Sequence, residues 1–507
     1  MYSLASVLDQ HAARRPDKTV LTQGDRRLTG AELRNRVGAL ARGLLDLGVG
    51  RGDVVGILLH NHLEFLELVF AVNRIGAVFL PLNFRLAPAE WEYILRDAEA
   101  AAVVTESEFA GAIDDLAPSL SSLRHRVILD APAPRGWTSY PALVEENHGS
   151  PRPEPVDVGE DELQRLMYTS GTTSRPKGVR ITHGNVIYKN LGQIIHLGLT
   201  HEDKTLVCGP LYHVGGLDLP ALATWHAGGS LVLLRKFDAG DVLAAIARER
   251  PTNLWLAPAM VNAVLQQPRL SDCDTSSVRF IAGGGEKTPE PVVRRIMEAF
   301  PNAWFADAYG LTETVSGDTF LDREHTLTKI GSVGRPIPHV RVRVVDDEGR
   351  DVPPGTLGEI VLRGPKVFSG YWRDEAATNQ AIRDGWFHTG DIGRLDEDGF
   401  LYIEDRKKDM IISGGENIAT PEVERVLYEH PAVLEAAVVA LAHERWGEVP
   451  RAFVVLRAGE KVTPAEIQEF CQARLARFKV PARVEITDQL PRTPSGKVLK
   501  RVLRDRP

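Results

Sequence analysis

One stretch of this 507-residue chain is the most informative starting point, and it reads Thr169-Ser170-Gly171-Thr172-Thr173-Ser174-Arg175-Pro176-Lys177-Gly178. Residues 163–168 before it are typical of a strand, and residues 179–185 after it of a strand that turns into a helix. Serine, threonine and glycine offer many N–H and O–H donors without bulky side chains, which suits polyphosphate oxygens. Lys177 adds a point charge for the outer phosphates. A solvated hairpin turn would use the same residue types, and no Walker sequence opens a helix here, so other segments must decide.

Composition limits the classes of protein to consider. Hydrophobic residues make up 43% and charged residues 25%, as in soluble globular proteins. The length indicates two or more domains. The formal net charge of -8 argues against a general nucleic-acid binder. The three cysteines (208, 273 and 471) are far apart, which predicts a reducing compartment, the cytoplasm, and neither a disulfide framework nor a zinc site.

The N-terminus and the apolar runs contain no membrane signal. No apolar run reaches transmembrane length, because Asn73 and Arg74 interrupt residues 69–82. The first residues lack the basic and then apolar pattern of a signal peptide. Residues 3–14 instead predict a short amphipathic helix that ends before Pro16.

Helix and strand patterns alternate through the first part of the chain. A helix is expected to start at Thr29, with Glu32 three residues further on as in a capping box. Residues 54–59 and 77–82 are typical of buried strands, and residues 64–75 of an apolar-striped helix. Such alternation predicts βαβ units and parallel sheet. Residues 130–160, rich in proline, glycine and acidic residues, are expected to form an exposed connection.

Several later segments place polar residues or glycines directly after a predicted strand or inside a turn. Their sequences are Leu206-Val207-Cys208-Gly209-Pro210-Leu211-Tyr212-His213-Val214-Gly215-Gly216-Leu217-Asp218, Phe280-Ile281-Ala282-Gly283-Gly284-Gly285-Glu286, Trp304-Phe305-Ala306-Asp307-Ala308-Tyr309-Gly310-Leu311-Thr312-Glu313-Thr314 and Trp386-Phe387-His388-Thr389-Gly390-Asp391. Three adjacent glycines let a flat group lie against the backbone. Taken singly, each segment is also consistent with an ordinary turn.

The last hundred residues predict a small α/β unit. Its helix begins near Pro421, and residues 436–441 and 452–456 are typical of strands. The charge run at 405–410 and the glycine-rich segment 411–418 precede it, and Pro491-Arg492-Thr493-Pro494-Ser495-Gly496-Lys497 comes near its end. Residues 405–507 contain 18 Lys and Arg against 15 Asp and Glu, a charge of +3, which leaves -11 for the rest. This asymmetry suits an anionic nucleotide and CoA.

Taken together and in this order, the segments resemble the motifs of the adenylate-forming superfamily. That superfamily includes acyl-CoA synthetases, aryl-CoA ligases, luciferases and the adenylation domains of peptide synthetases, and the chain looks most like a fatty-acyl-CoA synthetase. The resemblance extends from about residue 5 to the end. One position departs from it, because Ser174 stands where the family usually has glycine.

The resemblance implies an α/β fold in two domains. A large N-terminal domain, residues 1–404, would contain βαβ-built sheets and a β-rich subdomain. A small mobile α+β C-terminal domain, residues 405–507, would follow a hinge at 405–409 with Lys408 as its pivot. Segments 358–360 and 370–372 match structural motifs of the family, and no chemistry is assigned to them.

The resemblance also implies roles for individual residues. The expected catalytic residues are Lys497, Thr312, Glu313 and His213, with Glu313 as the Mg²⁺ ligand. The acyl pocket is expected to include Tyr212, His213, Gly216, Asp218 and Gly283, and the thiol-tunnel loop Gly414, Gly415 and Glu416. The nucleotide is expected to contact Thr169, Ser170, Gly171, Thr172, Thr173, Lys177, Gly284, Gly285, Glu286, Asp307, Tyr309, Gly310, Asp391, Arg406 and Lys497.

The implied reaction has two steps. A carboxylic acid attacks ATP to give an acyl-adenylate and pyrophosphate, and the thiol of CoA then takes the acyl group and releases AMP. The alternatives are an adenylation enzyme that loads an amino acid onto a carrier protein, and a binding protein that has kept only the fold. Asp218 motivates the first, because a carboxylate in the pocket could pair with a substrate amine; capping of a helix or contact with solvent would explain it equally well. The acid is left open, and so is the oligomeric state, with a homodimer among the options.

Overall fold

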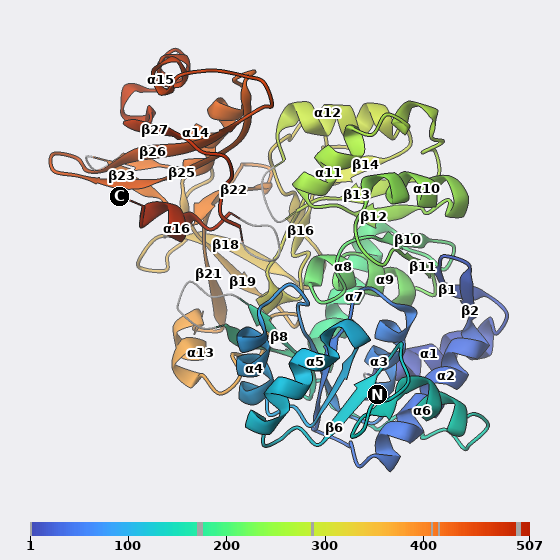
Figure 1. The fold of residues 1–507 in the computed structure, drawn as a ribbon. Helices are drawn as coiled ribbons and strands as arrows, with labels where there is room; N and C mark the ends of the chain where they lie inside the picture. The colour runs from blue at the N-terminus through green and yellow to red at the C-terminus, as the bar shows by residue number, and fades with distance from the viewer. Residues whose placement is uncertain are drawn as a thin grey trace. The chain divides into compact units, whose positions relative to one another are not determined.

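The computed structural model describes residues 3–169, 176–284, 288–406, 409–413, 416–492 and 498–506, and only the backbone of residues 416 and 417. Backbone contacts divide the chain into two compact units. The first unit comprises Met1–Arg341 and Leu362–Phe387, and the second comprises Val342–Val361 and His388–Pro507. The colours of Figure 1 follow the chain through both units.

The first unit contains two seven-stranded sheets of the predicted parallel kind. In one the strand order is β7-β6-β5-β3-β4-β8-β9, and only the β8–β9 pair is antiparallel. Its strands are β3 (Val54–Leu58), β4 (Val78–Pro81), β5 (Ala102–Thr105), β6 (His125–Ile128), β7 (Thr138–Ser139), β8 (Leu163–Thr169) and β9 (Lys177–Thr182). The central strands are buried throughout, as expected when helices cover both faces of a parallel sheet.

The second sheet has the order β14-β13-β12-β10-β11-β1-β2, with only β1–β2 antiparallel. Its strands are β1 (Thr19–Gln23), β2 (Arg26–Thr29), β10 (Lys204–Val207), β11 (Ser230–Leu233), β12 (Asn253–Trp255), β13 (Phe280–Ala282) and β14 (Trp304–Ala306). The chain thus returns to this sheet after completing the other one. A small sheet follows, formed by β15 (Ala308–Tyr309), β16 (Thr319–Phe320) and β17 (Arg335–Pro336).

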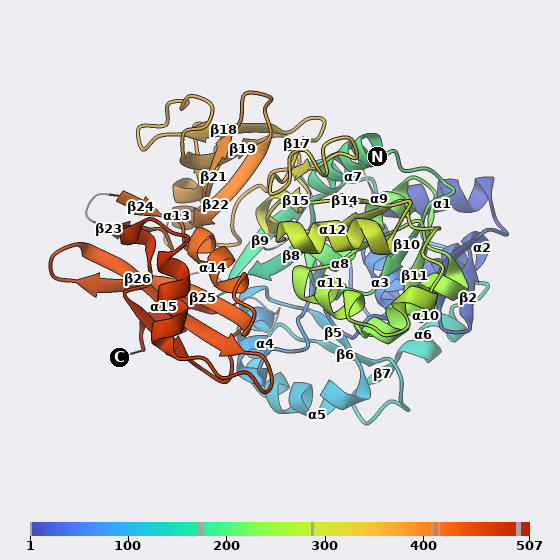
Figure 2. The same ribbon diagram turned by 90° about the horizontal axis from the view of Figure 1, so that it is seen from above.

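Helices connect and cover these sheets. They are α1 (Leu4–Arg14), α2 (Gly30–Asp46), α3 (Leu63–Arg74), α4 (Pro88–Asp97), α5 (Ser107–Leu116), α6 (Tyr140–Glu146), α7 (His183–Leu197), α8 (Val214–Asp218), α9 (Ala221–His226), α10 (Ala239–Glu249), α11 (Pro258–Leu265), α12 (Glu290–Ala299) and α13 (Glu375–Ala381). Helices α10, α11 and α12 lie side by side next to β12–β14 (Figures 1 and 2). No helix in the described part of the chain is long and apolar enough to cross a bilayer.

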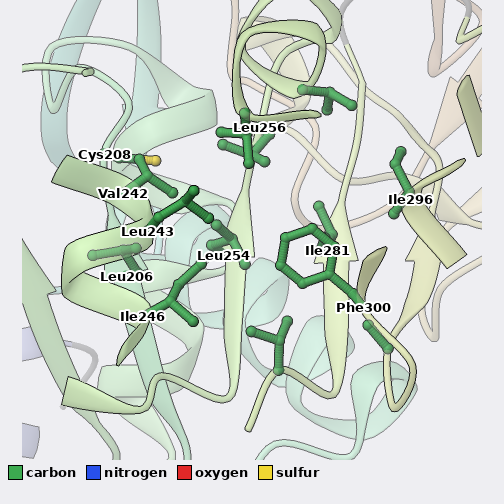
Figure 3. Packing of buried hydrophobic residues seen from close by; sticks show 14 of the residues in the cluster. Leu206, Cys208, Val242, Leu243, Ile246, Leu254, Leu256, Ile281, Ile296 and Phe300 are labelled. Carbon is green, nitrogen blue, oxygen red and sulfur yellow. The ribbon is translucent and has the colours of Figure 1, made fainter. Parts of the chain in front are cut away.

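Burial of alternate strand residues builds the core under α10–α12. Leu254 and Leu256 point into a cluster with Val242, Ile281 and Phe300, all almost fully buried (Figure 3). The residue between the two leucines, Trp255, is only half-buried. Because successive side chains of a strand point to opposite faces, Trp255 lies on the face of the sheet away from this core.

The local predictions for the N-terminal region are confirmed. Helix α1 begins after Ser3, whose hydroxyl accepts the N–H of Ala5, and ends at Arg14. Helix α2 begins after Thr29, and the hydroxyl of Thr29 and the carboxylate of Glu32 form the reciprocal bonds of a capping box. Both signals act within four residues, so the local sequence is sufficient to specify them.

The prediction of an exposed connection over residues 130–160 is wrong in part. Strand β7 and helix α6 lie within it, and Trp137 and Tyr140 are buried. The hydroxyl of Tyr140 donates to Glu67 of α3 over 2.6 Å. Contacts with distant helices therefore bury a segment whose composition is typical of a loop.

The second unit is strand-rich at first and then α+β. Its first strands are β18 (Arg341–Val345), β19 (Gly358–Arg363), β21 (Trp386–Leu395) and β22 (Leu401–Arg406). The first two residues of β21 belong to the first unit, where they pair with β20 (Ile382–Arg383). A sheet of order β24-β23-β26-β25, with β27 beside β26, contains β23 (Ile411–Ser413), β24 (Glu416–Ile418), β25 (Val433–His443), β26 (Gly447–Leu456) and β27 (Arg483–Ile486). Helices α14 (Thr420–Tyr428), α15 (Pro464–Gln472) and α16 (Lys500–Arg504) complete the unit. The boundary at 404/405 and the hinge stay predictions.

Candidate active site

The predicted acyl-pocket residues follow the carboxyl ends of neighbouring parallel strands. Tyr212 and His213 come after β10, and Gly283 directly after β13. Strand β12 lies between these two strands and ends at Trp255, which pairs in register with Ala282. In open α/β sheets, ligands bind outside the carboxyl ends of the strands. The first unit therefore gathers these residues where a ligand is expected.

An aromatic pair forms one wall of this region. The rings of His213 and Trp255 are stacked, with centroids 6.3 Å apart and planes at 28°. Gly209 and Gly215 lie against the same indole, since a Cβ on either would come within 2.6 Å of its ring. Glycine at both positions is what lets the backbone approach the tryptophan face so closely.

His213 is oriented by the helix that it precedes. It is the N-cap of α8, and its Nδ1 accepts the backbone N–H of Gly215 over 3.0 Å. In the neutral ring this bond places the proton on Nε2, which is then a donor. A donor is what a substrate carboxylate needs, so the geometry agrees with the predicted role of His213 beside that carboxylate.

The glycines after β13 allow close packing against the next strand and loop. A Cβ on Gly283 would lie 2.2 Å from the ring of Phe305, and one on Gly284 would lie 2.7 Å from the carbonyl oxygen of Ala308. Gly284 also has a φ of 142°, which side-chain-bearing residues rarely adopt. The segment therefore lies close to Tyr309 of β15, the residue predicted to face the adenine.

Glu313, the predicted metal ligand, is held at two atoms. It lies in the short helix Thr312–Thr314. The hydroxyl of Tyr371 donates to its Oε1 over 2.9 Å, and the N–H of Phe368 donates to its backbone carbonyl over 2.7 Å. Burial, with the Glu313 charge second, raises the pKa of Tyr371, so the phenol stays a donor. Thr312 precedes Glu313 and is half-buried.

Tyr371 also connects this carboxylate to the predicted phosphate loop. Residues 369–372 run beside β9: Arg180 donates its N–H to Gly370 over 3.0 Å, and Trp372 donates its N–H to Gly178 over 2.7 Å. The ammonium of Lys177 therefore lies 5.1 Å from the centre of the Tyr371 ring, in a cation–π contact. Thr169 pairs with Lys177 across the hairpin. The motif at 370–372, to which the sequence assigned no chemistry, thus places a side chain between two predicted site residues.

Asp391 and Arg406, two of the residues predicted to contact the nucleotide, come together in the second unit. Asp391 of β21 and Arg406 of β22 are paired in register, and Nε of Arg406 lies 3.3 Å from Oδ1 of Asp391. The hydroxyl of Thr389 accepts the N–H of Asp391 over 3.0 Å and donates to the carbonyl of Ile360 over 2.7 Å. Thr389 and Gly390, predicted to form a turn, instead lie within strand β21, where the Thr389 hydroxyl fixes the backbone of Asp391 and Gly390 has a φ of 71°.

Part of the predicted site lies outside the described residues. This applies to Ser170, Gly171, Thr172, Thr173, Gly285, Glu286, Lys408, Gly414, Gly415 and Lys497, and to the side chain of Glu416. Three further predicted residues of the first unit have structural roles. The carboxylate of Asp307 accepts the N–H of Ala308, and Gly310 and Gly216 allow close backbone contacts with Gly317 and Pro210.

Two explanations would place Asp218 outside the acyl pocket, capping of a helix and contact with solvent, and the structure agrees with neither. It is the last residue of α8, not its N-cap, and its side chain is fully buried. Oδ2 accepts from Nη2 of Arg165 over 2.6 Å, and Oδ1 lies 3.4 Å from the ammonium of Lys189. Both cations are also fully buried. Because the carboxylate already has two partners inside the chain, it does not require a substrate amine.

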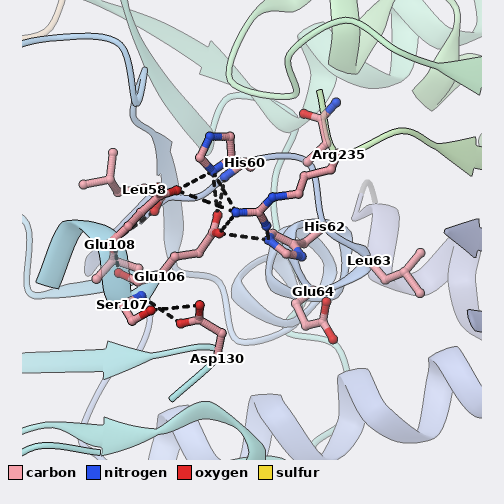
Figure 4. A network of polar contacts seen from close by, with 12 residues as sticks. Leu58, His60, His62, Leu63, Glu64, Glu106, Ser107, Glu108, Asp130 and Arg235 are labelled. Atoms are coloured by element: carbon pink, nitrogen blue, oxygen red, sulfur yellow. Dashed lines mark hydrogen bonds and ion pairs between the residues drawn. The ribbon is translucent and has the colours of Figure 1, made fainter. Parts of the chain in front are cut away.

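A second polar cluster joins the carboxyl ends of β3, β5 and β11 (Figure 4). Nδ1 of His60 lies 3.1 Å from Glu106 and 2.9 Å from Glu108, and Nε2 of His62 lies 3.2 Å from Glu106. Burial alone would raise the pKa of Glu106, but hydrogen bonds from His60 and His62 hold it well below its ordinary value. The guanidinium of Arg235 lies 2.5 Å from Glu106, so a side chain of the protein itself provides the positive charge beside this carboxylate.

Comparisons with known proteins agree with this arrangement. Residues 8–372 match the AMP-binding enzyme family, and residues 422–497 match the AMP-binding enzyme C-terminal domain. Feruloyl-CoA synthase of an Amycolatopsis species is 40% identical over 97% of this chain and 96% of its own length. Indoleacetate–CoA ligase of Aromatoleum aromaticum is 39% identical over 98% of this chain and 96% of its own.

A solved structure extends the comparison to bound ligands. o-Succinylbenzoate CoA synthetase of Bacillus subtilis, in complex with its acyl-adenylate intermediate, superposes with a TM-score of 0.87 at 33% identity and covers 99% of this chain and 98% of that one. The same enzyme with ATP and magnesium ion gives a TM-score of 0.86 at 33% identity, covering 98% and 99% of the two chains.

The chain therefore belongs to the AMP-binding enzyme family, the adenylate-forming superfamily predicted from its motifs. Within it the chain is an AMP-forming acid–CoA ligase, which activates a carboxylic acid with ATP and transfers the acyl group to CoA. It uses Mg²⁺ with ATP, and CoA is its co-substrate. The predicted fold class and reaction are confirmed.

Proposed function

We propose that the acid activated by this ligase is aromatic. The observation that carries the proposal is the wall formed by Trp255 and His213 with Gly209 and Gly215 behind it, because a flat ring can stack on such a surface. The compared relatives support it, since their names specify feruloyl, indoleacetate and o-succinylbenzoate as acyl groups. None of these three acyl groups is a fatty acid, the class that the overall look of the motifs suggested.

Residues proposed to contact ATP are described for each unit separately. In the first, Lys177 and the hydroxyls of the 169–173 segment would contact phosphate oxygens, and Tyr309, with Gly284 and the 285–286 segment, would face the adenine. In the second, Asp391 would accept hydrogen bonds from the ribose hydroxyls, while Arg406, 3.3 Å from Asp391, would orient that carboxylate and reach the same sugar.

Magnesium fits the donors that the first unit provides. The carboxylate of Glu313 is a hard oxygen ligand, and the Tyr371 bond orients it. When bound, Mg²⁺ supplies positive charge that offsets the charge of the phosphates. Thr312 would donate to the α-phosphate, and His213 would hold the substrate carboxylate through Nε2.

Lys497 is proposed to stabilise the negative charge that develops when two anions react. In the thioester-forming step Lys497 would obstruct the thiol. Rotation of the 405–507 domain about Lys408 would remove it and bring the loop at 414–416 towards the thiol path. Positioning and electrostatics would then account for most of the rate enhancement, with little acid–base chemistry by the protein.

The carrier-protein alternative loses its main support. It rested on Asp218 selecting a substrate amine, and that carboxylate is paired with Arg165 and Lys189. CoA is accordingly the proposed sole acceptor. The cytoplasm remains the proposed location, supported by the three free cysteines, of which Cys208 and Cys471 are buried. A homodimer remains a proposal without supporting contacts.

Pyrophosphate release over a panel of acids tests the aromatic proposal. The panel contains hydroxycinnamic, indoleacetic, benzoic, medium-chain fatty and amino acids, each with and without CoA. Trp255→Leu should raise the KM for aromatic acids at least about tenfold, the loss of one stacking contact of about 1.4 kcal/mol. Trp304→Leu is the matched control, because Trp304 is also half-buried but lies at the amino end of its parallel strand, β14, whereas Trp255 lies at the carboxyl end of β12. Equal preference for fatty acids in the wild-type enzyme would overturn the proposal.

A further inference from the structure

A left-handed turn begins two residues after the predicted metal ligand, Glu313. Val315, Ser316 and Gly317 have φ values of 56°, 61° and 65°. Residues with side chains rarely adopt this conformation, and two of the three carry one. Such backbone persists only where surrounding contacts fix it. The contacts that fix this turn therefore also determine where the chain at Glu313 is placed.

A buried lysine supplies the main contacts. The ammonium of Lys366 donates to the carbonyl of Ser316 over 2.9 Å and to Oδ1 of Asp318 over 2.6 Å. The side chains of Lys366 and Asp318 are 2% and 0% exposed. The other carboxylate oxygen of Asp318 accepts the hydroxyl of Thr314. Lys366 thus binds the turn at its middle and at its end.

The chain after Lys366 leads directly to Glu313. Phe368 donates its N–H to the Glu313 carbonyl over 2.7 Å, and Tyr371 donates its hydroxyl to the Glu313 carboxylate over 2.9 Å. The segment 366–371 therefore contacts the backbone and the side chain of the glutamate, as well as the turn that follows it. A displacement of Lys366 would shift all of these contacts together.

Stability alone is a poor explanation for this lysine. Moving two charges out of water costs hydration free energy, which their mutual attraction only roughly offsets. A protein with an apolar pair of equal volume in their place is often as stable. An ammonium with fixed acceptors does, however, hold a carbonyl and a carboxylate in one geometry. That property is valuable where a neighbouring ligand must be placed accurately.

We propose that Lys366 is a positioning residue, which holds the 315–317 turn and so places the Glu313 carboxylate for the metal–nucleotide complex. The proposal rests on the metal-binding role proposed for Glu313. It predicts that loss of the ammonium weakens the metal-dependent part of nucleotide binding and lowers kcat for adenylation. The KM for the acid should change little, because Lys366 does not contact the aromatic wall in the described structure.

The test compares variants of the full-length enzyme. Isothermal titration calorimetry measures the affinity for a non-hydrolysable ATP analogue with and without Mn²⁺. Lys366→Met should reduce the gain in affinity that Mn²⁺ provides at least about tenfold, with metal-free affinity changed less than about twofold. Lys366→Arg, which keeps a cation, should restore part of the gain. Since Lys366→Met leaves Asp318 buried without its cation, the double variant Lys366→Met/Asp318→Asn provides a version without a buried net charge and should show the same loss.

Two controls separate the possible outcomes. Arg74→Met also removes a buried cation from an ion pair, with the half-buried Asp9, and should lower stability without changing the Mn²⁺ gain. Glu313→Gln should abolish most of that gain. If Glu313→Gln has no effect, the proposed role of Glu313 fails. If Glu313→Gln acts but the folded Lys366 variants keep the wild-type gain, the positioning role of Lys366 is refuted while the role of Glu313 stands.

Discussion

Replacement of Asp218 by asparagine tests the buried charge cluster in the first unit. The change keeps the side-chain volume and removes one charge. In the wild type, Asp218 lies 2.6 Å from Arg165 and 3.4 Å from Lys189, and all three side chains are 0% exposed. The variant would leave two buried cations without their anion. We therefore expect a large loss of stability and no specific loss of substrate selectivity.

The size of the loss follows from the burial and the distances. At an effective dielectric constant of about 20, the gross attractions to Arg165 and Lys189 are roughly 6 and 5 kcal/mol. Desolvation offsets much of this in the intact cluster, whereas removal of one partner of a buried pair costs about 3–5 kcal/mol. The unfolding free energy of the first unit should fall by this amount at pH 6.

The loss should also depend on pH with a definite sign. Burial lowers the pKa of Lys189 to about 7, although Asp218 opposes the shift. Without Asp218 the pKa falls further, so Lys189 in the folded variant releases its proton at a lower pH. Between the Lys189 pKa of the variant and about 7, Lys189 is neutral in the folded variant but protonated in the unfolded variant and in the folded wild type. Over this interval the stability of the variant therefore rises with pH relative to that of the wild type. The penalty should therefore be largest near pH 5.5 and smaller at pH 8.

Urea unfolding followed by circular dichroism measures the effect. Glu290→Gln is the matched control, because its pair with Arg294 is exposed on both sides and should contribute less than about 1 kcal/mol. An Asp218→Asn variant as stable as the control at pH 6 would refute the argument from burial. If that variant also lost discrimination between amino acids and plain acids, the acyl-pocket prediction for Asp218 would stand instead.

Four further outcomes are expected. Lys497→Ala should slow adenylation at least about 10²-fold while thioester formation from supplied acyl-adenylate survives, and equal losses would contradict its role. Lys408→Pro, which fixes φ near roughly -65°, should spare adenylation and block thioester synthesis, and full synthesis would exclude this pivot. Tyr371→Phe should lower kcat/KM for pyrophosphate release at least about tenfold, because a hydrogen bond to the charged Glu313 is lost; an unchanged value would argue against it. Burial lowers the pKa of His226 from 6.5 to about 4, so about 3 kcal/mol of stability present above pH 6.5 should be lost as the pH falls towards 4, and His226→Gln should flatten that slope in thermal melts.

The resemblance to family motifs supplied candidate site residues but not their mutual contacts. The roles of Thr312, Glu313, Asp391 and Arg406 are predictions from that resemblance, and the structure shows that the last two side chains lie 3.3 Å apart. Tyr371 was missed because its hydroxyl acts on a residue 58 positions away. Trp255 was missed too, since one aromatic at the end of a short strand does not indicate which face of the sheet it occupies.

The sequence by itself determined features that depend on neighbouring residues. The start of α2 at Thr29, the buried strand β3 and the βαβ alternation all follow from patterns a few residues long. The pairing of charged groups whose partners are remote in sequence follows only from the tertiary structure. Asp218 met Arg165, 53 residues before it, and Lys366 met Asp318, 48 residues before it. A buried charge is stable only beside its partner, and folding alone brings such partners together.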